Sequence, residues 1–188
     1  GNSDEEWLNH RIELFEQYTM PSMLKQSNKN FTWLWLCDSI NHVSVINNLV
    51  AKYGDQINIV PVFASGDMSQ WQRHFIDYIN STLPKYDYQF LITSRLDNDD
   101  MLSANYIDWV QKHVHCDTEL LDFEGYQLDV ASNNLYVCQK YENKPSPFCS
   151  LIEEIGSAPL STVVIKDHTK LRDEFGSYIK IQVPLFTQ

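Results

Sequence analysis

Three carboxylates follow an apolar run in the middle of the chain. Residues 90–96 read Phe-Leu-Ile-Thr-Ser-Arg-Leu, and Asp97, Asn98, Asp99 and Asp100 come directly after them. Such a run is typical of a strand buried on both faces, whereas a carboxylate cannot be buried unpaired without a large desolvation cost. We therefore expect the acids where the strand leaves a sheet, which is where open α/β sheets bind ligands. Clustered carboxylate oxygens at such a place suit Mg²⁺ or Mn²⁺ carrying a polyphosphate.

The same residues have a second interpretation as an ordinary polar turn. Asp and Asn are common in turns and at helix caps, so spacing alone favours the metal site and the turn about equally. A calcium-binding loop fits less well, because its sixth and twelfth positions would be Leu102 and Asp108. Loops of that kind require Gly and Glu at these positions.

The elements that must position these acids alternate between helix and strand in the first half of the chain. Apolar side chains recur at helical spacing over residues 5–20, 43–53 and 68–83. Runs rich in β-branched and aromatic residues lie at 31–37, 57–63 and 90–96. Pro21 is expected to end the first helix. This alternation predicts an α/β fold with a mostly parallel central sheet flanked by helices and built from right-handed βαβ units.

The second half of the chain has a different pattern. Residues 119–124 and 134–139 are expected to form antiparallel strands around a turn at 131–134, because the connection is too short for a crossover. Residues 148–155 are predicted to form a short amphipathic turn or helix, and residues 161–165 a further strand. No segment has the composition of a linker, so a single domain of residues 1–188 is expected.

The composition limits the classes of partner. The chain has 14 basic against 25 acidic residues and a formal net charge of −11, which argues against nucleic acid because a duplex needs a basic face. An acidic protein that binds a phosphorylated small molecule needs local positive charge, and a divalent cation is an economical source. The sequence contains no C-x-x-C pair and no long apolar run. We expect a cytoplasmic protein, with peripheral association with the inner membrane left open.

Five motifs occur in order along nearly the whole chain. They are Leu14-Phe-Glu-Gln-Tyr-Thr-Met-Pro-Ser22, Phe31-Thr-Trp-Leu followed by Asp38, Ser94-Arg-Leu-Asp-Asn-Asp-Asp100, Pro145-Ser-Pro-Phe148 with Leu151 and Glu153, and Asp167-His168. In this order they resemble the nucleotide-sugar-dependent glycosyltransferases of A-type, Rossmann-like fold, and most closely the bacterial rhamnosyltransferase family. The resemblance implies a nucleotide-sugar-binding half, residues 1–102, and an acceptor-side half, residues 103–188.

The chain departs from this pattern at its two ends. It begins on a helix, whereas such folds normally open with a strand that holds part of the nucleotide. It stops at Gln188, about where the resemblance implies a His-Gly segment that completes the metal site. We therefore expect a chain trimmed at both ends.

The resemblance also implies a metal site. Asp99 would be the metal carboxylate, with Asp97 contacting the metal or the ribose, and Asp100 assisting or shaping the turn. His168 is the candidate third ligand of Mn²⁺ or Mg²⁺, because imidazole is compatible with Mn²⁺. The ordinary alternative for His168 is an exposed side chain after a strand.

Besides Asp97, three further residues are candidates for binding the nucleotide. Asp38 would read the edge of the nucleobase or, with equal weight, cap the helix that follows it. Arg73 and Arg95 could each reach a phosphate through the planar fork of a guanidinium group. We favour the nucleotide for Arg73, and for Arg95 the role of a counter-charge that keeps the acids together.

Inverting sugar transfer also requires a base that takes the proton of the acceptor hydroxyl. Glu153, Glu154 and Asp167 are the candidates, because each lies in the half that the resemblance assigns to the acceptor. Glu153 ranks first because it follows the motif at 145–148. Each of them taken alone is more often a solvated surface acid.

The predicted function is metal-dependent transfer of a sugar, with rhamnose as one candidate, from a nucleoside-diphosphate sugar to a glycan or lipid-linked acceptor. One rival is a nucleotidyltransferase, but such enzymes usually carry a Gly-rich phosphate loop near the N-terminus. The sequence has none there. The other rival is a catalytically inactive sugar- or nucleotide-binding domain. Neither the donor, the acceptor nor the oligomeric state follows from the sequence.

Overall fold

The structure is a computed structural model that describes residues 5–38, 42–83, 87–114, 118–138, 141, 144–156, 160–175 and 178–188. The helices are α1 (Glu5–Leu14), α2 (Met20–Leu24), α3 (Val43–Tyr53), α4 (Met68–Thr82), α5 (Tyr106–Lys112) and α6 (Leu171–Phe175). A π-helical turn (Phe15–Thr19) joins α1 to α2, and a 3-10 turn (His168–Lys170) precedes α6. The strands are β1 (Trp33–Asp38), β2 (Ile59–Ala64), β3 (Phe90–Ser94), β4 (Met101–Leu102), β5 (Glu119–Asp129), β6 (Asn134–Val137), β7 (Ser150–Glu154) and β8 (Ile179–Thr187).

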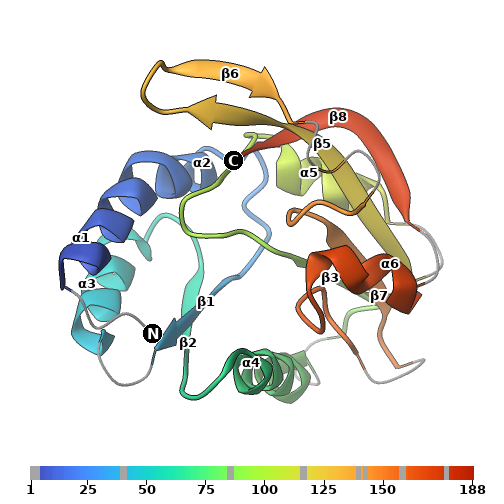
Figure 1. The fold of residues 1–188 in the computed structure, drawn as a ribbon. Coiled ribbons are helices and arrows are strands. Elements are labelled where there is room, and N and C mark those ends of the chain that lie inside the picture. Colours follow the sequence, from blue (N-terminus) through green and yellow to red (C-terminus); the bar gives the residue numbers. More distant parts are fainter. Residues whose placement is uncertain are drawn as a thin grey trace.

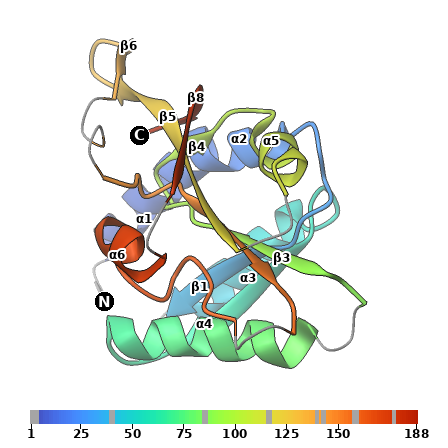
Figure 2. The ribbon, with the colours of Figure 1, turned by 90° about the vertical axis from the view of Figure 1, so that its right-hand side faces the viewer.

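The described strands form two separate sheets (Figure 1). β1 and β2 make a two-stranded parallel sheet next to α3. The larger sheet has the order β3-β7-β5-β8-β4, with β6 paired to the outer part of β5. Among the described residues its pairings are antiparallel except that of β5 with β8. The sheet curls, so that its two ends turn toward each other (Figure 2).

The prediction of a mostly parallel, Rossmann-like central sheet is therefore wrong. β3 was expected to be a central strand buried on both faces, but it is an edge strand that pairs with β7, and Thr93 is its one buried position. The central position belongs to β5 and β7, which come from the second half of the chain. Residues 148–155 were expected to be a turn or helix, and a short apolar run of this kind does not distinguish a buried strand from a helix.

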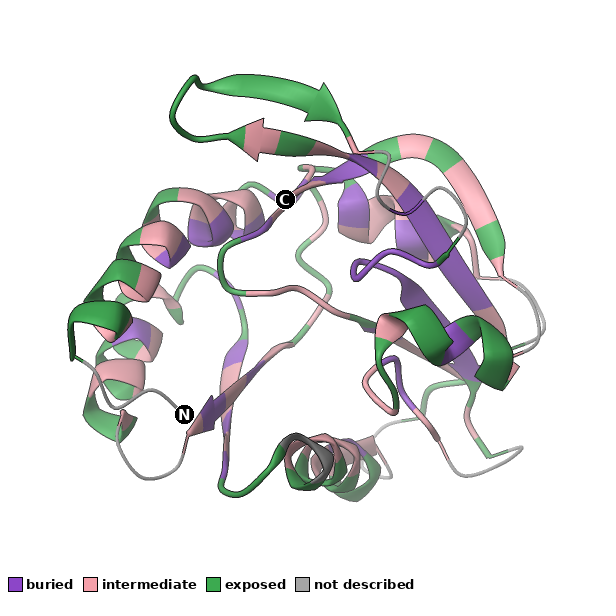
Figure 3. Ribbon diagram, in the orientation of Figure 1, coloured by how far each residue is buried: buried purple, intermediate pink, exposed green. Residues whose placement is uncertain are grey.

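A single cluster of buried apolar side chains connects the two sheets. It joins Phe15 of the π-helical turn and Trp35 of β1 to Phe123 of β5 and Ile152 of β7. Figure 3 shows that burial is concentrated along β5 and β7, which cross the middle of the larger sheet. These two strands are consequently the rigid support for the loops at the edge of the sheet.

The long helical segment at the N-terminus differs from its prediction. Pro21 was expected to end the helix, but the chain passes through the π-helical turn and continues as α2 to Leu24. Pro21 lies in the first turn of α2, directly after the π-helical turn, where the regular α-helical hydrogen-bond pattern is already interrupted. The predicted helix at 43–53 is confirmed as α3, with Gly54 at its C-terminal end. The antiparallel hairpin of β5 and β6 is also confirmed, whereas residues 161–165 do not form a strand.

The cysteines behave as apolar core residues. Cys37 and Cys149 are buried and reduced, and Cys138 is a free thiol of intermediate exposure. Burial raises the pKa of both Cys37 and Cys149 to about 12. Cys116 lies outside the described residues. Within the described ranges, every helix falls short of the length and apolar character needed to cross a membrane.

Candidate functional site

The three acids lie in the loop from β3 to β4 and share one pocket. Asp97, Asp99 and Asp100 contribute to the wall of a pocket of about 310 Å³. The remaining lining residues are Leu14, Tyr18, Met101, Leu128, Val130 and Gln188. Asp100 is almost fully buried, at 4% exposure, whereas Asp97 and Asp99 are half-exposed. We call residues 97–100 the acid loop.

Two arginines pair with the acid loop. Arg95 Nε lies 3.3 Å from Oδ1 of Asp97, and Arg11 Nη1 donates to Oδ2 of Asp99 at 2.8 Å. Arg11 Nη2 also donates a short hydrogen bond to the side-chain oxygen of Asn98. The N–H of Asp100 closes the turn by donating to the carbonyl of Asp97 at 3.3 Å. Guanidinium groups therefore hold the first three residues of the loop, Asp97 through Arg95, and Asn98 and Asp99 through Arg11.

The N-terminal helical segment runs beside the acid loop, which the sequence pattern did not predict. Ser22 Oγ accepts the N–H of Leu102 at 3.3 Å, just beyond the loop. The Gln26 side chain donates to the carbonyl of Ser103 at 2.7 Å and accepts the N–H of Ile107 at 3.1 Å. The signal that could have indicated this face is the spacing of Arg11, Leu14 and Tyr18, because residues three and four apart share one side of a helix.

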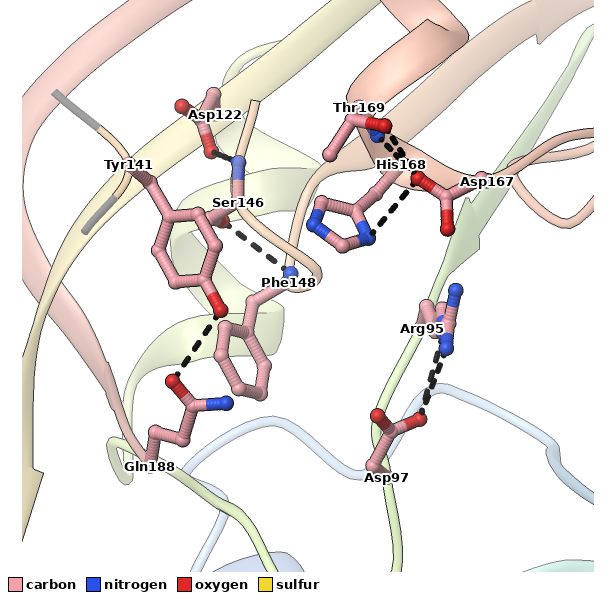
Figure 4. A network of polar contacts seen from close by, with 10 residues as sticks. All are labelled: Arg95, Asp97, Asp122, Tyr141, Ser146, Phe148, Asp167, His168, Thr169 and Gln188. Carbon is pink, nitrogen blue, oxygen red and sulfur yellow. Dashed lines mark hydrogen bonds and ion pairs between the residues drawn. The ribbon is translucent and has the colours of Figure 1, made fainter. Parts of the chain in front are cut away.

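A second polar group lies across from Arg95 (Figure 4). Asp167 Oδ1 accepts the N–H of Thr169 at 2.9 Å and the Thr169 hydroxyl at 2.5 Å. These two hydrogen bonds lower the pKa of Asp167. His168 Nδ1 is 3.8 Å from Oδ1 of Asp167, and the Tyr141 ring lies edge-on, 5.8 Å from the imidazole.

His168 is in a mixed electrostatic environment. Burial is the largest effect and lowers its pKa, Asp167 and Asp97 act in the opposite direction, and the charges of Arg95 and Lys144 lower it further. Its Nδ1 is buried and has no hydrogen-bond partner among the described residues. The neutral imidazole favoured by this environment is the form that can bind a metal ion.

Gln188 connects this group with the acid loop. Its Oε1 accepts a hydrogen bond from the Tyr141 hydroxyl at 3.2 Å, and the same residue lines the pocket of the acids. Arg95 makes the second connection, because it pairs with Asp97 and its charge also acts on Asp167 and His168. The structure thus brings five of the predicted residues into one region: Arg95, Asp97, Asp99, Asp100 and His168, with Asp167 beside them.

The two candidate bases on β7 are placed differently. Glu153 is 5% exposed, and its carboxylate accepts the N–H groups of Ser161 at 2.7 Å and Thr162 at 2.9 Å. Thr162 has a φ of 63°, a backbone conformation that is uncommon for a β-branched residue. Glu154 is exposed and faces Phe90 of β3 in the sheet register. Glu153 consequently binds the segment that leads to Asp167.

Asp38 and Arg73 do not line the pocket of the acids. Asp38 ends β1 and lies opposite Ala64 of β2. The helix that it was expected to cap, α3, begins at Val43 and has His42, not Asp38, at its N-cap position, so this alternative is wrong. Arg73 is exposed on α4, which packs beside β2.

The side chains around the pocket can be compared with the ligands that a divalent cation requires. Nowhere in the described ranges do three His, Cys, Asp or Glu side chains converge to hold a metal ion. Mg²⁺, however, is usually held by one or two carboxylates together with substrate phosphates and water, not by an all-protein cage. Half-exposed Asp97 and Asp99 in one pocket fit a cation of this kind, which arrives with a diphosphate.

A pocket lined by acids at the end of a strand, with arginine and imidazole groups beside it, is a candidate active site. Comparison with known families identifies the class of enzyme. The family model described as "Putative rhamnosyl transferase" matches residues 3–182. The chain therefore belongs to this family of sugar transferases, and it is an enzyme with a sugar donor and an acceptor. No curated protein matches the chain at a significant level.

Proposed function

We propose that this enzyme transfers a sugar, with rhamnose as the first candidate, from a nucleoside-diphosphate sugar to a glycan or lipid-linked acceptor. The observation that supports this most directly is the shared pocket of Asp97, Asp99 and Asp100. Cleavage of the sugar–phosphate bond leaves a diphosphate whose developing charge must be neutralised. A Mn²⁺ or Mg²⁺ ion held by Asp99 and Asp97 would supply that neutralisation as a Lewis acid when bound.

The residues around the pocket have separate tasks in this proposal. Asp99 and Asp97 present carboxylate oxygens for the cation, and Asp100 shapes the loop from its buried position. His168 presents a neutral imidazole to the same region, which suits a further ligand or a hydrogen-bond partner of the donor. Arg95 keeps Asp97 in place and contributes positive charge where the diphosphate would lie.

Asp167 is the preferred base among the three predicted candidates. Its described hydrogen bonds are all made by Oδ1, which leaves Oδ2 for an acceptor hydroxyl. Glu153 is less suitable for this role because it is buried and already accepts two backbone N–H groups.

The acceptor would approach from the hairpin of β5 and β6. Leu128 and Val130 line the acid pocket, and Val130 is 60% exposed. The apolar surface continues on β6, where the exposed side chains of Leu135 and Val137 share the face of Leu128. An acceptor that carries an apolar portion near its reacting hydroxyl would bury this surface, which favours a lipid-linked acceptor over a free glycan.

The proposal is tested by calorimetry with Mn²⁺ and a panel of nucleoside diphosphates, followed by transfer assays with nucleoside-diphosphate rhamnose. Wild type is expected to bind one nucleoside diphosphate only with Mn²⁺ present. Asp99→Asn is expected to lower kcat by about 100-fold or more, because the ligand interacts with charge that grows in the transition state. Asp77→Asn, a change of an exposed acid on α4, is the matched control and should act like wild type.

Two outcomes would contradict the proposal. If wild type binds sugars without metal and releases no nucleoside diphosphate, the protein is a binding domain and not a transferase. If Asp99→Asn were as active as wild type, the acid loop would have no part in the reaction.

A further inference from the structure

Arg11 makes the most direct contact between the acid loop and a residue far from it in the sequence. Its guanidinium donates from Nη1 to Asp99 at 2.8 Å and from Nη2 to the neighbouring Asn98. We propose that Arg11 is the positioning residue of the acid loop, and that it orients the Asp99 carboxylate for the cation and couples the order of α1 to ligand binding. This inference rests on the proposed function.

The chemistry of the contact requires arginine. A guanidinium group is planar and presents donors in a fixed fork, so one side chain can bind two acceptors in a set geometry. Here the two acceptors are on consecutive residues, and binding both fixes the turn between them. A lysine would supply the charge as a single point and could not fix both side chains in this way.

The charge balance of the pocket supports the same role. Three carboxylates share one pocket, and like charges at short range oppose each other. Arg11 neutralises Asp99 as Arg95 neutralises Asp97. Because Arg11 binds Oδ2 of Asp99, the other carboxylate oxygen remains for a ligand. Carboxylates that bind metals are commonly held in this way by a hydrogen bond to their second oxygen.

The position of Arg11 on the helix explains why α1 takes part. No residue of α1 is buried, so α1 is weakly packed, and the contact of Arg11 with the acid loop is one of its ties to the rest of the protein. The same helical face continues with Leu14 and Tyr18, which line the pocket. Between them the chain enters a π-helical turn, a distortion that frequently occurs at functional sites.

A consequence follows from thermodynamic linkage. If α1 holds the acid loop in the form that binds the cation, then binding of the cation must stabilise the position of α1 to the same extent. The opposite arrangement, in which the cation replaces Arg11 on Asp99, would loosen α1 on binding. The two arrangements therefore predict opposite changes in Mn²⁺ affinity when Arg11 is removed. They also predict opposite changes in the hydrogen exchange of α1 when ligand binds.

The experiment compares wild type, Arg11→Met, Arg11→Lys and the control Lys52→Met. Lys52 forms an ion pair with Glu16 of the same helical segment at 2.7 Å, but it does not touch the acid loop. Circular dichroism first establishes that each variant is folded. The probes are Mn²⁺ alone and Mn²⁺ with each nucleoside diphosphate, measured by calorimetry, and hydrogen exchange of residues 5–18 and 97–102 with and without these ligands.

The positioning role predicts weaker binding in the variants of Arg11. Mn²⁺ affinity should fall by about 10-fold to 100-fold in Arg11→Met, as for other residues that orient metal ligands. Arg11→Lys should recover only part of this loss, and Lys52→Met should bind as wild type does. In wild type, ligand should slow hydrogen exchange over residues 5–18, and in Arg11→Met this slowing should disappear.

Four results would overturn the inference. Tighter Mn²⁺ binding by Arg11→Met, or faster exchange in α1 on ligand binding, would show that the cation replaces Arg11. Unchanged affinity would show that Arg11 does not orient the loop. A wild type that binds Mn²⁺ neither alone nor with any nucleoside diphosphate would contradict the proposed function. In that case the inference about Arg11 is tested only by the hydrogen exchange of residues 97–102 without ligand. It should be about tenfold or more faster in Arg11→Met, and unchanged exchange would overturn the inference.

Discussion

The buried carboxylate of Glu153 accepts the backbone N–H of Thr162 at 2.9 Å. Its other oxygen accepts the N–H of Ser161 at 2.7 Å, so one side chain of β7 satisfies two donors of the segment that leads to Asp167. The next residue, Val163, is held by the Thr93 hydroxyl of β3 at 2.9 Å. The edge of the sheet therefore fixes the backbone that carries the candidate base, including the unusual φ of Thr162.

This relationship predicts a loss of stability for Glu153→Gln. The amide keeps one acceptor oxygen but turns an N–H₂ group toward a backbone donor, so one buried N–H loses its partner. The expected decrease in the free energy of unfolding is about 1–3 kcal/mol, measured by urea denaturation. Glu154→Gln, the exposed neighbour, is the control and should change stability by less than about 0.5 kcal/mol. Unchanged stability in Glu153→Gln, together with a large loss of kcat, would instead favour Glu153 as the base.

Asp167→Asn tests the preferred base. If Asp167 takes the proton of the acceptor hydroxyl, kcat should fall by about 10²-fold to 10⁴-fold, while the affinity for Mn²⁺ and the nucleoside diphosphate stays at the wild-type value. Thr169→Val separates geometry from chemistry, because it removes the hydroxyl that donates to Asp167 at 2.5 Å but keeps the carboxylate. This variant should lose far less activity. A loss of donor affinity in Asp167→Asn would place the residue at the donor instead.

Asp122 predicts a pH dependence of stability. It lies fully buried on β5, where it accepts the N–H of Ser146 at 2.9 Å, and Lys180 is 3.8 Å away. Burial is the largest effect and raises the pKa of Asp122 above its ordinary value of 3.8, although the bonds to Ser146 and the charge of Lys180 act against it.

Because the pKa of Asp122 is raised, the folded state binds more protons than the unfolded state. The contribution of Asp122 to the free energy of unfolding is therefore fully present below a pH of about 3.8 and is lost as the pH rises through the pKa of the folded state. Asp122→Asn keeps an oxygen for the Ser146 N–H but cannot titrate. The free energy of unfolding of wild type relative to Asp122→Asn should therefore decrease as the pH rises. An increase would mean that Lys180 and not burial dominates.

The local sequence pattern was sufficient to predict the elements whose interaction partners are close in the sequence. The helix at 43–53 was predicted with its end at Gly54, and the hairpin of β5 and β6 followed from the short turn between its strands. These features depend on spacing and turn residues, which are visible within about ten to fifteen residues.

The sheet topology was not predictable in the same way, because it depends on partners far apart along the chain. β7 reads as a short apolar run that fits a helix or a strand, and its place between β3 and β5 decides the matter. β8 shows alternation at Ile179, Ile181 and Val183, but Pro184 interrupts it. The same limitation applies to the site. The acids at the end of β3 were visible in the sequence, whereas Arg11 lies 88 residues from Asp99 along the chain.

Gly125 predicts a specific effect of packing. It lies on β5 at a shift in the register with β8, and an added Cβ would come within 2.3 Å of the Phe186 ring. Phe186 is 2% exposed and stacks on Phe148, with 4.1 Å between the ring centroids, so it has no free space to enter. Gly125→Ala should lower the free energy of unfolding by about 1–3 kcal/mol, measured by urea denaturation. The double variant Gly125→Ala with Phe186→Leu should be less destabilised than the sum of the two single changes, because the smaller side chain removes the clash. If the two effects were strictly additive, the register shift between β5 and β8, and not the Phe186 ring, would explain why glycine is required at this position.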